Sequence, residues 1–156
     1  MSRRTSTKKR LPIQDPLFDI YAISLLANKI LKNGKKTVAH KIIQEAFQYI
    51  YRKTNRNPLK VFRLAVTNTR PMVEVKSRRI GGSTYPVPRE VKTFRSINLA
   101  LKWIVEAATN KSGRKMAIKL GNELIDASNK TGIAIRKKEE MHKMAKANKA
   151  FAHYRY

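Results

Sequence analysis

The sequence predicts a mainly α-helical protein, with a six-helix, bundle-like body and a two-stranded β-hairpin arm between the third and fourth helices. Three observations lead to this fold class. Apolar residues recur at helical spacing along most of the 156 residues. Residues 72–89 change to alternating spacing around a Gly-Gly pair. Helix start and stop signals divide the remaining chain into six segments.

Three helices are expected before the hairpin. They cover about residues 18–33, 37–53 and 57–68. Asn33-Gly34 is a common way to end a helix, because both residues tolerate the left-handed conformation. Asn57 is a good N-cap, and Pro58 suits the first helical position.

The hairpin is predicted from a change of period. Residues 72–79 alternate apolar and charged side chains, Gly81-Gly82 supplies a turn, and residues 84–88 return. The return strand contains two prolines, which cannot donate ladder hydrogen bonds, so it must lie at an edge or in a free ribbon. An isolated hairpin is marginally stable. We therefore expect a projecting arm whose tip orders fully only against a partner.

Three more helices are expected after the hairpin, over about residues 96–110, 114–129 and 133–149. Trp103 falls on an apolar stripe, so we assign it to packing. The last helix has only a thin apolar seam, so we expect it to pack along one edge and to present its charged residues to a partner. No repeat or second domain is evident. We expect a flexible basic arm over residues 1–15 and a single helical domain over residues 16–156.

The charge of the chain is its most unusual property, with 35 Lys and Arg against 10 Asp and Glu, a formal net charge of +25. Such self-repulsion favours a polyanionic partner. Nucleic acid is the first candidate, and an anionic membrane and an acidic protein are alternatives. The charge gathers in the N-terminal arm, the hairpin and residues 136–156. Two further pairs, Lys35-Lys36 and Arg114-Lys115, stand at helix starts, where backbone N–H groups also favour phosphate.

Aromatic residues fall into two groups. Those beside basic residues are candidates for stacking on bases, namely Tyr85, His153, Tyr154 and Tyr156. Those within the second helix are expected in the core or at a helix edge, namely Phe47, Tyr49 and Tyr51.

Catalysis and cofactor binding are not expected. The chain has no cysteine, which excludes disulfides, cysteine zinc sites and a thiol nucleophile. Its three histidines and three aspartates lack the spacing of a metal site or a two-metal nuclease. No run reaches the ~18 apolar residues of a membrane span. The basic N-terminus lacks the apolar region of a secretory signal, and we interpret it as an arm rather than a transit peptide.

Several stretches resemble one family, the small-subunit ribosomal protein seven of bacteria and organelles. The most specific are VEVKSRRIGGSTYPVP (73–88), GRKMAIKL (113–120) and IRKKEEMHKMAKANKAFAHYRY (135–156). ILKNGKKTVA (30–39) and the opening MSRR also fit, and the resemblance covers nearly the whole chain in order. The departures are Lys146, where the family usually has Glu, and the loosely matched stretches LAVTNTRP and KTFRSINLALKWIVEAATNK.

The resemblance implies a non-catalytic protein that binds the head (3′ major) domain of the small-subunit ribosomal RNA and helps to nucleate head assembly. It implies ribosomal RNA contacts through Arg3, Arg4, Lys9, Arg10, Lys35, Lys36, Lys76, Arg78, Arg79, Arg95, Arg114, Lys115, Lys119, Arg136, Lys137 and Lys143. Residues near the exit-site transfer RNA and the messenger would be Gly81, Gly82, Lys146, Lys149, Tyr154 and Arg155.

The resemblance also implies partners and a location. The expected neighbours are small-subunit ribosomal proteins nine, eleven, thirteen and nineteen, with no membrane contact and no homo-oligomer. The chain length and the abundance of Lys, Asn and Ile favour a ribosome of the plastid stroma, with the bacterial cytoplasm as the alternative. Two other classes stay open: a DNA-binding or architectural protein, and a membrane-surface module, against which the thin apolar face of the last helix argues.

Overall fold

The structure, a computed structural model, describes Phe18 and residues 20–154, apart from the side chains of Ile80 and Tyr154. This part of the chain contains six α-helices and one antiparallel hairpin, so the predicted fold class is confirmed. The elements are α1 (Tyr21–Ile30), α2 (Lys36–Thr54), α3 (Pro58–Thr69), β1 (Val73–Ile80), β2 (Ser83–Glu90), α4 (Thr93–Asn110), α5 (Met116–Ser128), α6 (Ile133–Ala147) and a short 3-10 helix η1 (Lys149–Tyr154).

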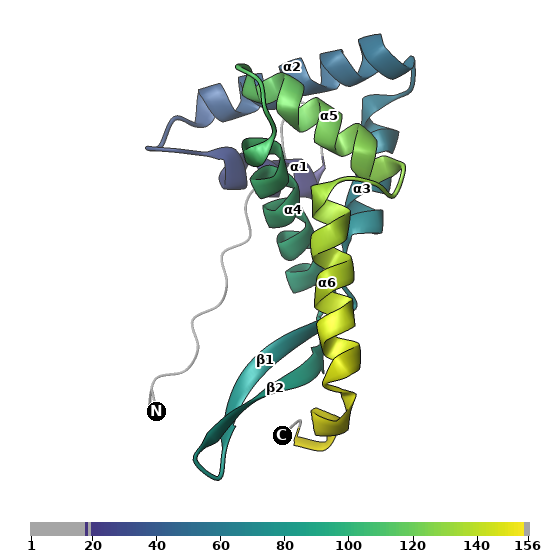
Figure 1. Ribbon diagram of the computed structural model, residues 1–156. Helices are drawn as coiled ribbons and strands as arrows, with labels where there is room; N and C mark the ends of the chain where they lie inside the picture. The colour runs from purple at the N-terminus through teal and green to yellow at the C-terminus, as the bar shows by residue number, and fades with distance from the viewer. Residues whose placement is uncertain (1–17, 19, 155–156) are drawn as a thin grey trace.

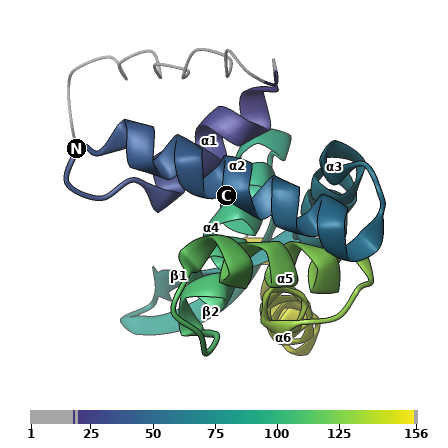
Figure 2. The same cartoon turned by 90° about the horizontal axis from the view of Figure 1, so that it is seen from above.

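The helices form a body from which α6 and the hairpin extend together. In Figure 1, α1, α2 and α5 lie across the upper part, and α4 and α6 run downward. The hairpin lies beside the lower half of α6; both strands contact α6, and β2 also contacts η1. Figure 2 looks along α6 and shows α2 and α5 side by side above it.

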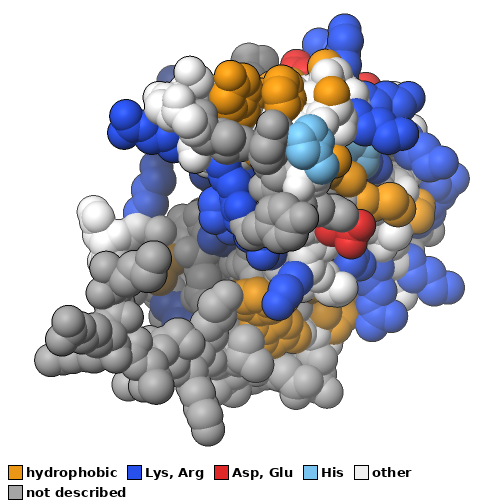
Figure 3. All heavy atoms as spheres, turned by 90° about the horizontal axis from the view of Figure 1, so that it is seen from below, with side chains coloured by type: hydrophobic (Ala, Val, Ile, Leu, Met, Phe, Trp, Pro, Cys, Tyr) orange, Lys and Arg blue, Asp and Glu red, His pale blue; other side chains and the backbone are white. Residues whose placement is uncertain are grey.

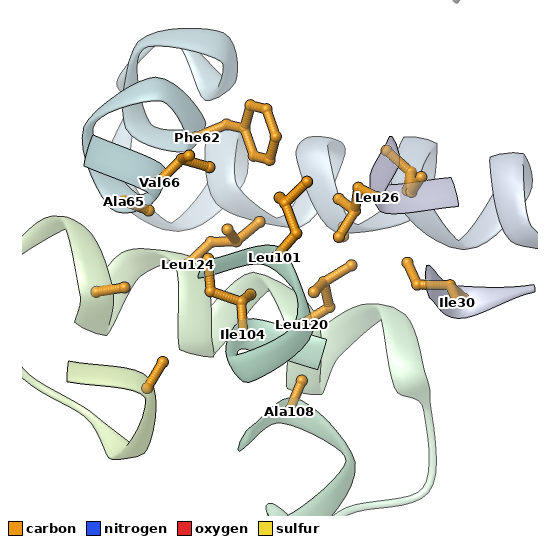
Figure 4. Packing of buried hydrophobic residues seen from close by; sticks show 14 of the residues in the cluster. Leu26, Ile30, Phe62, Ala65, Val66, Leu101, Ile104, Ala108, Leu120 and Leu124 are labelled. Atoms are coloured by element: carbon orange, nitrogen blue, oxygen red, sulfur yellow. The ribbon is translucent and has the colours of Figure 1, made fainter. Parts of the chain in front are cut away.

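The core is centred on α4, which contacts α1, α3, α5 and α6. Leu101 and Ile104 of α4 are fully buried. Figure 4 shows them among Phe62 of α3, Leu26 of α1 and Leu124 of α5. These apolar residues recur at the helical spacing found in the sequence, and their burial supplies the main stabilising free energy of the body.

α2 and α5 approach each other closely at Gly121. A Cβ atom at this position would lie 2.7 Å from Cδ1 of Tyr49 and 3.4 Å from the carbonyl oxygen of Ala46. Tyr49 in turn donates from its hydroxyl to Oδ1 of Asn122 at 3.0 Å. Tyr49 therefore lies at the helix edge, as predicted. The two helices also run in the same direction and begin at the same end of the molecule (Figures 1 and 2).

Several predicted boundaries differ from the observed ones. α1 is shorter than residues 18–33, because the backbone leaves the helical region at Leu31 and turns through Asn33 and Gly34, both at positive φ. α4 begins at Thr93, three residues before the expected start. α6 ends at Ala147, and η1 follows. The predicted start of α3 is confirmed, since the Asn57 side chain accepts a hydrogen bond from the Leu59 N–H at 2.9 Å.

The predicted hairpin is confirmed and its return strand is an edge strand, but the base of the hairpin packs on the body and does not project freely. Val87 and Pro88 are buried, and the Tyr85 ring packs on Phe151 of η1 with centroids 5.1 Å apart. The strands are therefore supported by the C-terminal segment of the same chain. The prediction for the turn is correct: Gly81 and Gly82 both have positive φ, of 57° and 92°, as a two-residue hairpin turn requires.

Candidate nucleic-acid interface

Three helices of the described chain have a lysine as their N-cap residue. Lys35, Lys92 and Lys115 are the N-cap residues of α2, α4 and α5, and their side chains are exposed. These helix starts have no side-chain capping hydrogen bond within the described residues and no acidic residue in the first turn. Lysine is unfavourable there, because the helix dipole already places positive potential at the start. The combination of a basic side chain and available backbone N–H groups suits a phosphate.

The two predicted helix-start pairs lie at the same end of the molecule. Lys35 and Lys36 precede and open α2, and Arg114 and Lys115 precede α5, its parallel neighbour (Figures 1 and 2). All four side chains are exposed. We call these four residues the helix-start cluster. The fold thus places two helix starts, almost 80 positions apart in the sequence, at the same end of the body.

A second basic region lies where the hairpin meets the start of α4. A hollow of about 350 Å³ is lined there by four cations and two acids: Lys76, Arg89, Lys92, Arg95, Glu74 and Glu90. We call these six residues the hairpin-base hollow. Nε of Arg95 donates to Oε2 of Glu74 at 2.7 Å. The Arg95 side chain is nevertheless 60% exposed, so it can bind a further anion.

Sequence reasoning missed Lys92 and Arg89 as site residues. The sequence pattern places the start of the fourth helix at about Ser96, so it gives Lys92 no place at a helix start. With the true start at Thr93, Lys92 becomes an N-cap. No local signal marks this position, because neither Lys92 nor the residues before it resemble a capping sequence.

The hairpin itself presents three of the predicted residues. Lys76 and Arg78 are two positions apart on β1, so they share one face, and Arg79 lies on the other. All three are exposed, and Arg78 pairs across the ladder with Tyr85. The tip glycines Gly81 and Gly82 are exposed as well. Both faces of the ribbon are therefore basic near its tip.

The predicted residues of α5 and α6 differ in their surroundings. Arg136 and Lys143 are exposed. Nζ of Lys137 bonds to Oε2 of Glu106 at 2.7 Å, and this hydrogen bond lowers the pKa of the Glu106 carboxyl although burial opposes it. Nζ of Lys119 donates to the Thr109 carbonyl at 3.3 Å. Lys137 and Lys119 therefore also serve intramolecular contacts.

A groove of about 780 Å³ lies where the hairpin base meets α6 and η1. Val73, Pro88 and Ala145 contribute its apolar walls. Lysines stand along the groove at positions 143, 146 and 149, and all three are exposed. We call it the hairpin–α6 groove. Figure 3, which views this end of the molecule, shows Lys and Arg side chains beside hydrophobic ones.

A buried ionic network ties the start of α6 to the α4–α5 turn. Glu123 is fully buried, and its Oε2 lies 2.7 Å from Nζ of Lys111, which also bonds to Asp126. Its Oε1 accepts from the Ala134 N–H at 3.0 Å, which caps α6. Burial opposes the charge of Lys111, but its bonds to Asp126 and Glu123 outweigh it and raise the Lys111 pKa.

Some predicted site residues lie outside the described part of the chain. These are Arg3, Arg4, Lys9, Arg10, Arg155 and Tyr156, together with the side chain of Tyr154. Among the described residues, no group of three or more His, Cys, Asp or Glu side chains is placed to hold a metal ion. None of the described helices is long and apolar enough to cross a membrane.

Comparison with known proteins agrees with the resemblance noted in the sequence. The family model of ribosomal protein S7p/S5e matches residues 2–149. Small ribosomal subunit protein uS7 of Thermosynechococcus vestitus is 50% identical over 156 residues, and that of Acaryochloris marina is 52% identical, with both chains covered completely. This family is structural and non-enzymatic, in agreement with the prediction that the chain is not an enzyme. The chain belongs to the ribosomal protein S7p/S5e family.

Proposed function

We propose that this chain is a structural protein of the small ribosomal subunit, which binds the head domain of the small-subunit ribosomal RNA and helps to nucleate head assembly. The observation that carries this proposal is the set of three helix starts whose N-cap residues are Lys35, Lys92 and Lys115. None of these helices has an acidic residue in its first turn. A protein folded for water alone gains stability from acids at such positions. Lysine at a helix start becomes favourable when that helix start binds a phosphate.

The contact residues fall into separate sets that fit one folded RNA. The helix-start cluster lies at one end of the body, the hairpin-base hollow lies at the far end of α4, and the basic face of α6 adds Arg136 and Lys143. Folded RNA offers phosphates in several directions, and its shape is recognised mainly through backbone contacts. We assign the predicted contacts of residues 1–15 to the same partner.

We assign the hairpin tip and the end of α6 to the exit-site transfer RNA and the messenger. Gly81 and Gly82 are exposed at the tip, and Lys146 and Lys149 are exposed along the hairpin–α6 groove. These elements extend away from the helix-start cluster (Figure 1), so they can reach a second ligand while the body holds the first. Tyr154 and Arg155 complete this assignment.

We infer a ribosome of the plastid stroma as the location, with neighbours among small-subunit proteins nine, eleven, thirteen and nineteen. The full-length relatives from Thermosynechococcus vestitus and Acaryochloris marina are cyanobacterial, which is compatible with a plastid or a bacterium. The abundance of Lys, Asn and Ile supports the plastid.

The proposal is tested by measuring the affinity of the full chain for a head-domain RNA fragment over a range of salt concentrations. With six or more phosphate contacts, we expect the affinity to fall roughly 10³-fold between about 50 and 200 mM salt. Duplex DNA of the same length serves as the competitor, and we expect it to displace the RNA poorly. A shallow salt dependence, or equal competition by DNA, would contradict the proposal.

A further inference from the structure

The outer face of α2 carries a second groove, which none of the contact sets above includes. Its α2 residues are Gln44, Phe47, Gln48, Tyr51 and Arg52. These positions follow the i, i+3, i+4, i+7, i+8 spacing of one helical face. Phe18 faces them from the chain before α1. We call this the α2 groove, and its volume is about 360 Å³.

Aromatic rings form the apolar part of the α2 groove. The rings of Phe18 and Phe47 meet edge to face with centroids 5.2 Å apart, and Phe47 packs inward on Phe62. Tyr51, in contrast, is 59% exposed. The predicted place of Tyr51 at a helix edge is confirmed, but its ring is left largely open to solvent. The groove therefore combines a packed aromatic floor with an accessible ring beside it.

Polar groups border the rings on the same face. Gln44 and Gln48 are exposed one turn apart, and an amide side chain offers both hydrogen-bond donors and an acceptor. Arg52 is exposed at the C-terminal end of the groove, and Arg56 is exposed just beyond α2. A single groove thus offers a stacking surface, groups able to bond a base edge, and positive charge for a phosphate.

This combination matches single-stranded RNA better than a protein surface. Unstacked bases bind to proteins by stacking on aromatic side chains and by hydrogen bonds to their edges, while Arg or Lys contacts the backbone. The volume of about 360 Å³ lies within the roughly 300–1,000 Å³ of ordinary ligand sites. The α2 face also adds positive charge to a chain of net charge +25, which disfavours a basic protein partner.

We propose that the α2 groove holds one unstacked nucleobase of the small-subunit ribosomal RNA. Tyr51 stacks on the base, Gln48 bonds its edge and Arg52 contacts the adjacent phosphate. This proposal rests on the proposed function, because it names a further site for the same RNA. It adds a contact that depends on stacking to a set of contacts that depend on charge.

Stacking and charge leave different signatures in the salt dependence of binding. Replacing Tyr51 by Ala removes the ring, and we expect the affinity for the head-domain RNA fragment to fall roughly 5- to 150-fold at every salt concentration. The slope of log affinity against log salt should stay at the wild-type value. Arg52→Gln should instead make that slope shallower by about 0.7 to 0.9. Tyr51→Phe, which keeps the ring, should bind within about twofold of the wild type.

Leu64→Ala is the matched control, because Leu64 is also an exposed apolar residue, at 50%, but lies on α3 outside the groove. It should bind RNA as the wild type does. A Tyr51→Ala chain that binds the fragment normally would overturn the inference. If that chain also entered small subunits poorly, the groove would be assigned to a protein partner instead. In both cases steep salt dependence of the wild type would leave the proposed function standing.

Discussion

Nε2 of His142 on α6 accepts a hydrogen bond of 3.1 Å from the backbone N–H of Met72, which immediately precedes β1. This contact joins the base of the hairpin to the last helix over 70 positions of sequence. Only a neutral imidazole can accept at Nε2. Burial, and then the nearby charge of Lys138, lower the pKa of His142 below its usual value of 6.5. The fold therefore favours the state that the hydrogen bond needs.

Protonation of His142 is expected to loosen the hairpin. The pKa of His142 is lower in the folded state than in the unfolded state. The stabilising contribution of the neutral imidazole is therefore present above pH 6.5, and it is lost as the pH falls from 6.5 through the lower pKa of the folded state. We expect wild-type stability to fall by about 0.5–1.5 kcal/mol more than that of His142→Gln between pH 7 and 5. Thermal unfolding at several pH values measures this difference. Identical pH profiles for the wild type and His142→Gln would contradict the expectation.

Loss of Lys111 should be strongly destabilising. Lys111→Met would leave the fully buried Glu123 carboxylate without its cation, at a cost of about 3–5 kcal/mol. Glu123→Gln should cost less, since its amide oxygen can still accept from the Ala134 N–H. Denaturant unfolding of both variants and of the double variant tests this order. Equal losses from the two single variants would show that the buried charge itself has no cost.

The same network has a defined pH dependence. The bonds from Lys111 to Asp126 and Glu123 raise the pKa of the Lys111 ammonium above its usual 10.5. The stabilisation is therefore fully present at neutral pH and is lost only as the pH rises above that value. Relative to Lys111→Met, the wild type should lose stability as the pH is raised from 9 to about 11.5 in unfolding experiments. Parallel curves for the two chains would contradict this assignment.

The sequence predicted the helices well because their apolar faces are local patterns. Leu120, Leu124 and Ala127 repeat at helical spacing and are all fully buried. The boundaries were less predictable. α4 starts at Thr93 behind a lysine N-cap, which local capping preferences disfavour, so the expected start fell at Ser96. Lys92 at the N-cap departs from the local preference that would otherwise mark the start of the helix, a kind of departure that is common at functional sites.

Contacts between distant parts of the chain could not be predicted. Tyr85 was proposed for base stacking from its basic neighbours, yet its ring packs on Phe151, 66 positions later. Glu123 lies within a helical stripe that otherwise reads as apolar, and only the fold reveals Lys111 opposite to it. The first contact depends on how the C-terminal segment returns beside the hairpin, and the second depends on how α5 turns back on the end of α4. A helical period contains no information about either path.

Gly121→Ala should destabilise the body although alanine favours helices. The added Cβ would lie 2.7 Å from Cδ1 of Tyr49, so the ring must move and its bond to Asn122 must stretch. We expect a net loss of about 1–3 kcal/mol, as for other overpacked interiors. Unfolding by denaturant measures it. Restored stability in the pair Gly121→Ala with Tyr49→Ala would confirm that the clash is the cause.

The lysines at the helix starts should contribute to RNA binding one charge at a time. Lys92→Gln and Lys115→Gln each remove one cation from an exposed N-cap, and glutamine does not weaken the helix start. Each should make the slope of log affinity against log salt shallower by about 0.7 to 0.9, without loss of stability. Lys60→Gln on α3, which is exposed but lies outside the basic clusters, should keep the wild-type slope. If Lys60→Gln changed the slope as much as Lys92→Gln, binding would depend on total charge, and the helix starts would have no special role.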